Sequence, residues 1–173
     1  MEGTASAVGR ALLVEAERRI FHENMPRLKK CLSILTEEEI WYRPNQQTVS
    51  VGNLVLHLCG NARQWITSGL GGAPDYRDRT AEFAEKGPIS TDKLMDKLSD
   101  VMAEVHEVIR SIEPCSLLHS RRVQGFEESG LSILVHVIEH FSYHVGQITY
   151  YVKSLKNMDL KYYEGVDLNR KSA

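Results

Sequence analysis

The amino-acid sequence predicts an all-α protein, a four-helix bundle in up-down-down-up order. Apolar residues recur at three- and four-residue steps over four long stretches, which is the period of a buried helix face. Each of the last three stretches begins at a serine that suits a helix N-cap. A long connection with glycines and prolines separates the second stretch from the third, and such crossovers occur in bundles whose neighbouring helices run parallel.

Composition narrows the class of protein. The 173 residues are 42% hydrophobic and 25% charged, so we expect a single domain over residues 1–173 with a polar tail at about 157–173. The net charge of −2 provides no basic surface for nucleic acid or an anionic membrane. No apolar run reaches the roughly 18 to 20 residues of a membrane span, and Met1–Thr4 does not begin a secretion signal. We therefore expect a cytoplasmic protein.

The first two elements are a long helix and a short turn. The first helix should cover about residues 5–35, with a kink or break just before Pro26, because proline lacks a backbone donor. Thr36 and Glu39 have the spacing of a capping box, so a short helical turn should begin at Thr36 and end before Pro44. The cysteines Cys31, Cys59 and Cys115 have no paired spacing, and we interpret them as reduced core residues.

A polar stripe accompanies the apolar face of the second helix, which should run from Ser50 to about Ser68. Its members include His57, Asn61 and Gln64, which recur at steps of four and three. Polar residues beside a buried helix face are either hydrogen-bonded core residues or the wall of a site. Taken alone, His57 is best interpreted as a hydrogen-bonded core residue. A role as a metal ligand becomes the better interpretation only if other histidines require a further ligand.

The connection over residues 69–90 should contain one helical turn near residues 80–84. It also carries a charged run in which Arg77 and Arg79 are either solvated surface residues or contacts for an anionic substrate group. The third helix should run from Ser90 to about Ile112. The segment 115–128 is expected to be irregular, with a short extended piece at 121–123.

Histidines on the last helix are the strongest functional signal. The helix should run from Ser129-Gly130 to about residues 153–157, with His136, His140 and His144 in register beside its apolar stripe. Because a helix rises 1.5 Å per residue, His136 and His144 lie about 12 Å apart along the axis. Zinc holds nitrogen ligands at roughly 2.0 to 2.1 Å, so one ion can bind only one neighbouring pair.

The two pairs predict different chemistry. His136 and His140 form an H-x-x-E-H pattern with Glu139 as general base, as in inverted zinc peptidases. That alternative needs a third ligand downstream, where only Glu164 remains, and the chain is far shorter than such peptidases. His140 and His144 form a different motif, His-x-x-x-His-x-Gly-Gln-Ile, with Gln147 in it.

This motif resembles that of the DinB/YfiT-like family of four-helix bundles. The helix number, the turn at 36–44 and the long crossover after Gly69 are also similar. The resemblance implies that His57, His140 and His144 bind one divalent metal ion, with zinc or nickel preferred and iron or manganese as alternatives. It implies a homodimer as well. Asn61, Gln64, His136 and Gln147 would then be neighbours of the ligands or contacts for substrate.

The resemblance implies several activities rather than one. Family members include thiol-dependent transferases and isomerases that use bacillithiol, mycothiol or glutathione, alongside metal binders without an assigned reaction. Three neutral imidazoles leave coordination positions open, as in catalytic sites, and the ion would lower the pKa of a bound water or thiol. We expect a metal-dependent enzyme, either a thiol S-transferase or a hydrolase, that acts on a small molecule. A transferase of this kind would use a low-molecular-weight thiol as its cosubstrate. The alternatives are a non-catalytic metal-containing binding bundle, the zinc peptidase, and a purely structural bundle with core histidines.

Overall fold

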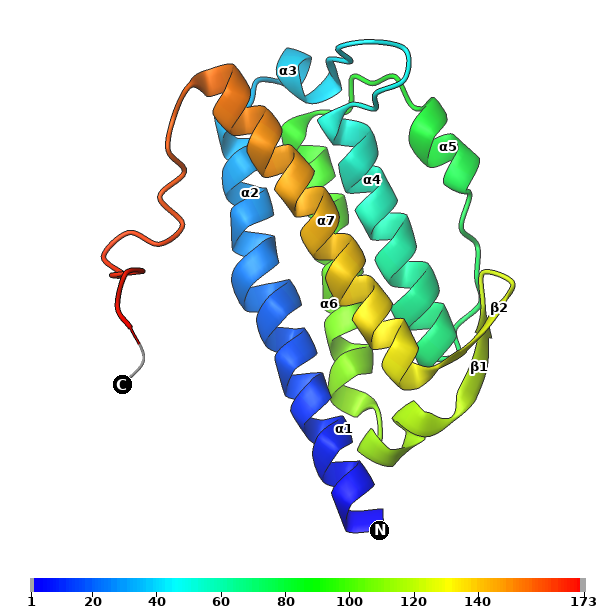
Figure 1. Ribbon diagram of the computed structural model, residues 1–173. Helices are drawn as coiled ribbons and strands as arrows, with labels where there is room; N and C mark the ends of the chain where they lie inside the picture. The colour runs from blue at the N-terminus through cyan, green and yellow to red at the C-terminus, as the bar shows by residue number, and fades with distance from the viewer. Residues whose placement is uncertain (1, 172–173) are drawn as a thin grey trace.

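The N-terminal helical segments continue into one another from Glu2 to Ile34. A computed structural model describes residues 2–171 and places α1 (Glu2–Glu17), the π-helical η1 (Arg18–Asn24) and α2 (Met25–Ile34) in succession (Figure 1). The predicted kink or break before Pro26 takes the form of the wider π turn. Pro26 lies in the first turn of α2, where its missing N–H is tolerated.

The short turn and the second long helix begin as predicted. Thr36 caps α3 (Glu37–Trp41) in a capping box with Glu39. Ser50 caps α4 (Val51–Ala62), and Asn53 completes a second capping box there. The helix then widens into the π-helical η2 (Arg63–Leu70) and ends at Gly71, so the sequence prediction of an ordinary helix to about Ser68 missed a change of register.

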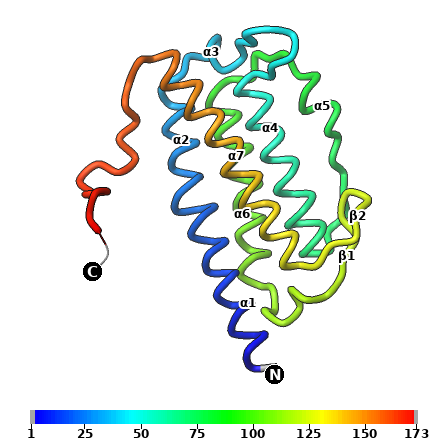
Figure 2. Tube along the Cα trace, viewed as in Figure 1, coloured from blue at the N-terminus to red at the C-terminus, as the bar shows by residue number. Residues whose placement is uncertain are grey.

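The crossover connection runs along the outside of α4. It contains α5 (Arg79–Ala84), which confirms the helical turn predicted near residues 80–84, and α5 packs on α4 (Figures 1 and 2). Asn53 holds the end of α5 in place, because its Nδ2 donates to the carbonyl oxygens of Glu82 and Glu85, both at 2.9 Å.

The third and last long helices also match their predicted caps. Ser90 caps α6 (Thr91–Ser111), and Ser129 caps α7 (Gly130–Lys156). The helix α4 packs on both α6 and α7, and α2 packs on α7. None of the described helices is long and apolar enough to cross a membrane.

A small hairpin is the exception to the predicted all-α class. The short η3 (Pro114–Leu118) leads into β1 (Ser120–Val123), which pairs antiparallel with β2 (Phe126–Ser129). Gln124 and Gly125 join the strands, and both have positive φ, as a two-residue hairpin turn requires. The prediction identified an extended piece at 121–123 but not its partner.

Cysteine burial corrects one expectation. Cys31 and Cys59 are buried core residues, whereas Cys115 in η3 is exposed rather than part of the core. Burial raises the pKa of the Cys59 thiol to about 12. In the tail, Leu160 is buried and Tyr162 packs against the core, so the chain after α7 folds back at these positions.

Thiol titration should follow this burial. We expect an aromatic disulfide reagent to modify Cys115 within minutes in the folded protein, while Cys31 and Cys59 react only after denaturation. The absorbance released before and after addition of guanidinium measures the two classes, and a Cys115→Ser variant should abolish the fast phase. A fast phase of three thiols would contradict the packing described here.

Candidate metal centre

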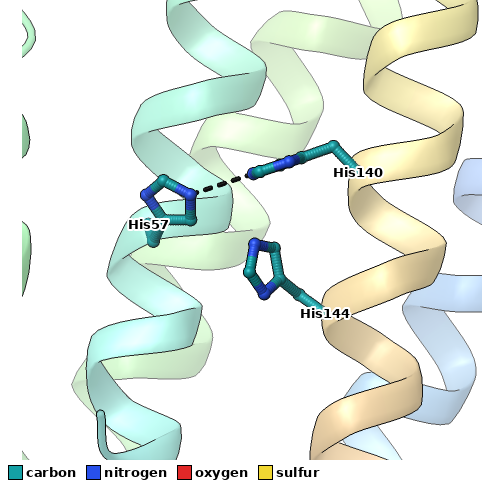
Figure 3. Close-up of side chains that lie close together, drawn as sticks. All are labelled: His57, His140 and His144. Carbon is teal, nitrogen blue, oxygen red and sulfur yellow. Dashed lines mark hydrogen bonds between the residues drawn. The ribbon is translucent and has the colours of Figure 1, made fainter. Parts of the chain in front are cut away.

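Three histidine side chains meet between α4 and α7. His57 projects from α4, and His140 and His144 project toward it from successive turns of α7 (Figure 3). One ring nitrogen from each residue lies within 4.8 Å of the other two, and the Nε2 atoms of His57 and His140 are 2.9 Å apart. His57 and His144 are buried, and His140 is half-buried.

The helices place these rings for simple reasons. His140 and His144 are four residues apart on α7, so they lie on one face. Phe141 and Val145, the next residue after each, point into the core and fix the rotation of the helix. Almost every residue of α4 is buried, so a histidine on the side that faces α7 cannot turn to solvent.

His57 and His144 each have a polar hydrogen-bond partner on the side of the ring away from the centre of the cluster. The Nδ1–H of His57 donates to Oε2 of Glu82 at 2.9 Å, and the Nδ1–H of His144 donates to Oε1 of Gln147 at 2.7 Å. A neutral imidazole that donates from Nδ1 keeps its lone pair on Nε2. Both rings therefore turn an Nε2 lone pair toward the third histidine.

Arg77 shares the carboxylate of Glu82 with His57. Its Nε donates to Oε1 at 2.7 Å and its Nη2 to Oε2 at 2.9 Å, and both side chains are more than nine-tenths buried. Nη2 also lies 3.0 Å from Nδ1 of His57. Because arginine only donates, and the carboxylate already claims the Nδ1 proton, we interpret this last approach as proximity rather than as a hydrogen bond.

Burial favours the neutral form of the two cluster histidines on α7. Burial, followed by the neighbouring His144, His57, His136 and Arg77, lowers the pKa of His140 to about 3. Burial also lowers the pKa of His144, although the hydrogen bond to Gln147 opposes it. Burial raises the pKa of Glu82, but its bonds to Arg77 and His57 outweigh that effect and the net shift is downward. An ionised carboxylate thus accepts the Nδ1–H of His57.

His136 lies outside this group. Its ring stacks on Trp65 at 3.7 Å and on His140 at 5.3 Å between centroids, and its Nε2 is 3.3 Å from Nδ2 of Asn61. Burial lowers the pKa of His136 as well. Glu139 is exposed, and Glu164 pairs with Lys161 in the tail. Within residues 2–171 no third ligand accompanies His136 and His140, so the structure lends no support to the peptidase alternative.

The other predicted residues surround the centre at greater distance. Gln64 accepts from Arg77 at 2.8 Å and donates to Asp75 at 2.7 Å, so it supports Arg77. The guanidinium of Arg79 lies over the ring of Phe83 at 4.8 Å, and that ring lies 4.8 Å from His57. The guanidinium of Arg77 donates hydrogen bonds to Glu82 and Gln64. The predicted anion contacts of both arginines remain predictions.

Sequence reasoning missed Glu82 and Phe83. They belong to α5, 25 and 26 residues after His57, and no spacing rule links a residue in a crossover connection to a helix packed beside it. A weak signal exists in Gly60, whose position would place a Cβ against the Glu82 carboxylate. A glycine in the middle of a buried helix indicates that something approaches closely.

The donor set fits a divalent metal ion. Two nitrogen ligands held at 2.0–2.1 Å by one ion lie about 3 Å apart, and the Nε2 atoms of His57 and His140 are 2.9 Å apart. Zinc, nickel, copper and iron all accept imidazole ligands. Neutral rings oriented by outer hydrogen bonds are the usual form of such ligands.

Comparison with known proteins gives one family and one fold. A family model described as a protein of unknown function, DUF1572, matches residues 8–164. A crystal structure of a DinB-like protein from Bacillus cereus ATCC 10987 is similar, with a TM-score of 0.63 and 19% identity over 81% of this chain and 90% of that chain. At this identity the likeness concerns the fold alone. No curated protein matches the chain.

Metal content should separate the two histidine pairs. Elemental analysis of purified protein, reconstituted with zinc or nickel and desalted, should give close to one ion per chain for wild type. His57→Ala and His144→Ala should lose the ion, because each removes one of three ligands, whereas His136→Ala should retain it. Circular dichroism checks that each variant folds. Loss of metal in His136→Ala with retention in His144→Ala would instead favour the peptidase pair.

Proposed function

We propose a metal-dependent enzymatic function for this chain, which belongs to the DUF1572 family of DinB-like proteins. The enzyme would either transfer a thiol to a small molecule or hydrolyse a small molecule. Family membership and helical fold confirm the resemblance to DinB-like proteins that the sequence predicts. We also infer the up-down-down-up order of the long helices, which the crossover outside α4 supports (Figure 1).

The main support for the proposal is the convergence of three imidazole side chains. Within the described residues, the group of potential metal ligands consists of His57, His140 and His144 alone. Structural zinc sites use four protein ligands, whereas three protein ligands leave a position for water or substrate. When bound, a divalent ion at this position supplies Lewis acidity, which lowers the pKa of a neighbouring thiol or water.

The residues of the chain have separate tasks in this proposal. His57, His140 and His144 hold the ion, and the lowered pKa values of His140 and His144 reduce competition from protons at those two ligands. Phe83 packs against the ring of His57 at 4.8 Å between centroids and covers that side of the cluster. Exclusion of water strengthens every electrostatic interaction inside such a site.

A thiol used by this site must come from outside the chain. Cys59 lies two residues after His57 in the buried part of α4, and its raised pKa keeps it protonated. Cys31 contacts Tyr162 at 3.2 Å near the tail, and Cys115 belongs to η3. Since no cysteine joins the histidine group, a low-molecular-weight thiol is the cosubstrate that we propose.

One cavity shares a single residue, Gln147, with the surroundings of the centre. A cavity of about 310 Å³ is lined by uncharged residues, among them Leu54, Ile148, Tyr42 and Tyr151, and it includes Gln147, the partner of His144. Its volume and mainly apolar lining suit a small organic molecule. We propose that the electrophile occupies this cavity, with Gln147 between it and the histidines.

Other features of the proposal follow from the sequence. Zinc or nickel is the preferred ion, and the protein is a cytoplasmic homodimer without a nucleic-acid or membrane partner. Exposed apolar side chains on α7, namely Leu131, Val135, Tyr143 and Tyr150, support an interface between two copies.

A second candidate is a metal-containing bundle that binds a ligand without turnover. The observation that favours it is the lack of a general base: among the described residues near the histidines, Glu82 lies behind His57 in a bond with Arg77, and Glu139 is exposed. This weakens the hydrolase form of the proposal more than the thiol-transfer form, in which the thiolate itself is the nucleophile.

Thiol transfer can be measured directly. Metal-loaded protein is mixed with glutathione, bacillithiol or mycothiol and 1-chloro-2,4-dinitrobenzene, so that a carbon–sulfur bond forms and chloride leaves. We expect at least one thiol to react faster than without protein, and His57→Ala to lower the rate about 100-fold, since Lewis-acid stabilisation amounts to several kcal/mol.

The matched control is His22→Ala, which removes an exposed histidine far from α4 and α7 in sequence and should leave the rate unchanged. Stoichiometric metal without thiol-dependent turnover on this or other electrophiles would favour the non-catalytic bundle.

A further inference from the structure

We infer that Glu82 is a positioning residue that fixes the ring of His57 with its proton on Nδ1 and its Nε2 lone pair facing His140 and His144. Neither the histidine motif nor the family match assigns a role to the crossover connection that carries Glu82. The expected effect on metal affinity rests on the proposed metal centre. The tautomer of His57 does not depend on it.

The hydrogen-bond geometry supports one tautomer of His57. Oε2 of Glu82 lies 2.9 Å from Nδ1, on the edge of the ring opposite His140. A carboxylate accepts and does not donate, so Nδ1 carries the proton and Nε2 is the acceptor. A histidine ligand whose other nitrogen donates to a carboxylate is held in orientation and made more basic.

Arg77 holds the carboxylate in this position. Its two hydrogen bonds to Glu82, at 2.7 and 2.9 Å, form a bidentate pair, and the exposed fractions of the two side chains are 4% and 9%. Gln64 accepts from Nη1 of the same guanidinium at 2.8 Å. A buried ion pair with this geometry leaves the carboxylate little freedom to turn away from His57.

The main chain of α5 is fixed as well. Nδ2 of Asn53 donates to the carbonyl oxygens of Glu82 and Glu85, one turn of α4 before His57. Gly60, almost one turn after His57, leaves the space into which the carboxylate fits. The polar residues of α4 thus dock the crossover connection onto the back of the metal centre.

Docking of α5 and binding of the ion are therefore coupled. An ion bound by His57 favours the Nδ1–H form, which favours the docked carboxylate, and by linkage a displaced carboxylate lowers the affinity for the ion. Loss of such an outer partner typically lowers metal affinity 10–100-fold.

Gly60→Ala tests this role without removing a charge. A Cβ at this position would collide with Oε1 of Glu82 and crowd Nε of Arg77, so the carboxylate would be forced away from its position beside His57. The helix itself should gain stability, because alanine is the better helix former. The matched control is Gly146→Ala on α7, where nothing lies within 4 Å of an added Cβ.

Two measurements report the outcome. Long-range ¹H–¹⁵N correlation spectra of metal-free protein identify which nitrogen of His57 is protonated, and calorimetric titration with zinc gives the affinity. We expect wild type and Gly146→Ala to show a single Nδ1–H form of His57. Gly60→Ala should show a mixture of tautomers and an affinity for zinc that is 10–100-fold weaker.

An Nε2–H form of His57 in the wild type would overturn the inference, as would wild-type tautomer and affinity in Gly60→Ala. Should Gly60→Ala fail to fold, Glu82→Asp carries the same expectation, because it withdraws the carboxylate by one methylene and keeps the charge opposite Arg77. An Nδ1–H form in a wild type that takes up no zinc would refute the metal centre and support the positioning role.

Discussion

The meeting of three imidazole rings between α4 and α7, two of them buried and His140 half-buried, is the constraint on which the rest of the site depends. A charged imidazole is costly to bury, and here the pKa of His140 falls to about 3. His140 is therefore neutral, and the polar nitrogens of each buried ring need hydrogen-bond partners. Glu82 and Gln147 accept hydrogen bonds from Nδ1 of His57 and His144, respectively. The Nε2 lone pairs of these two rings therefore point toward the centre of the cluster.

This constraint explains why the crossover connection packs against α4. A carboxylate could reach the buried Nδ1 of His57 only from an element packed outside α4, and α5 is that element. Arg77 compensates the charge that the carboxylate brings with it, while Asn53 and Gln64 satisfy the remaining polar groups. The long connection is thus part of the site rather than a tether between helices.

The sequence predicted most of what lies within single helices and little of what lies between them. Ser50, Ser90 and Ser129 identified helix starts because a cap is a local hydrogen bond. His140 and His144 share a helix face for the same local reason, whereas His57 required the family resemblance. Glu82 was missed because its contact depends on packing across the crossover, and the hairpin was missed because Gln124-Gly125 is an unusual pair for its turn. The π segments η1 and η2 left no signal in the apolar period.

The central claim is that one metal ion belongs to His57, His140 and His144. Anomalous diffraction from crystals of the zinc-loaded protein, collected on both sides of the zinc absorption edge, tests it most directly. We expect a single strong peak between α4 and α7, at about 2.0–2.1 Å from one nitrogen of each of the three rings. A peak held by His136 and His140, or no peak in protein soaked with excess zinc, would contradict it.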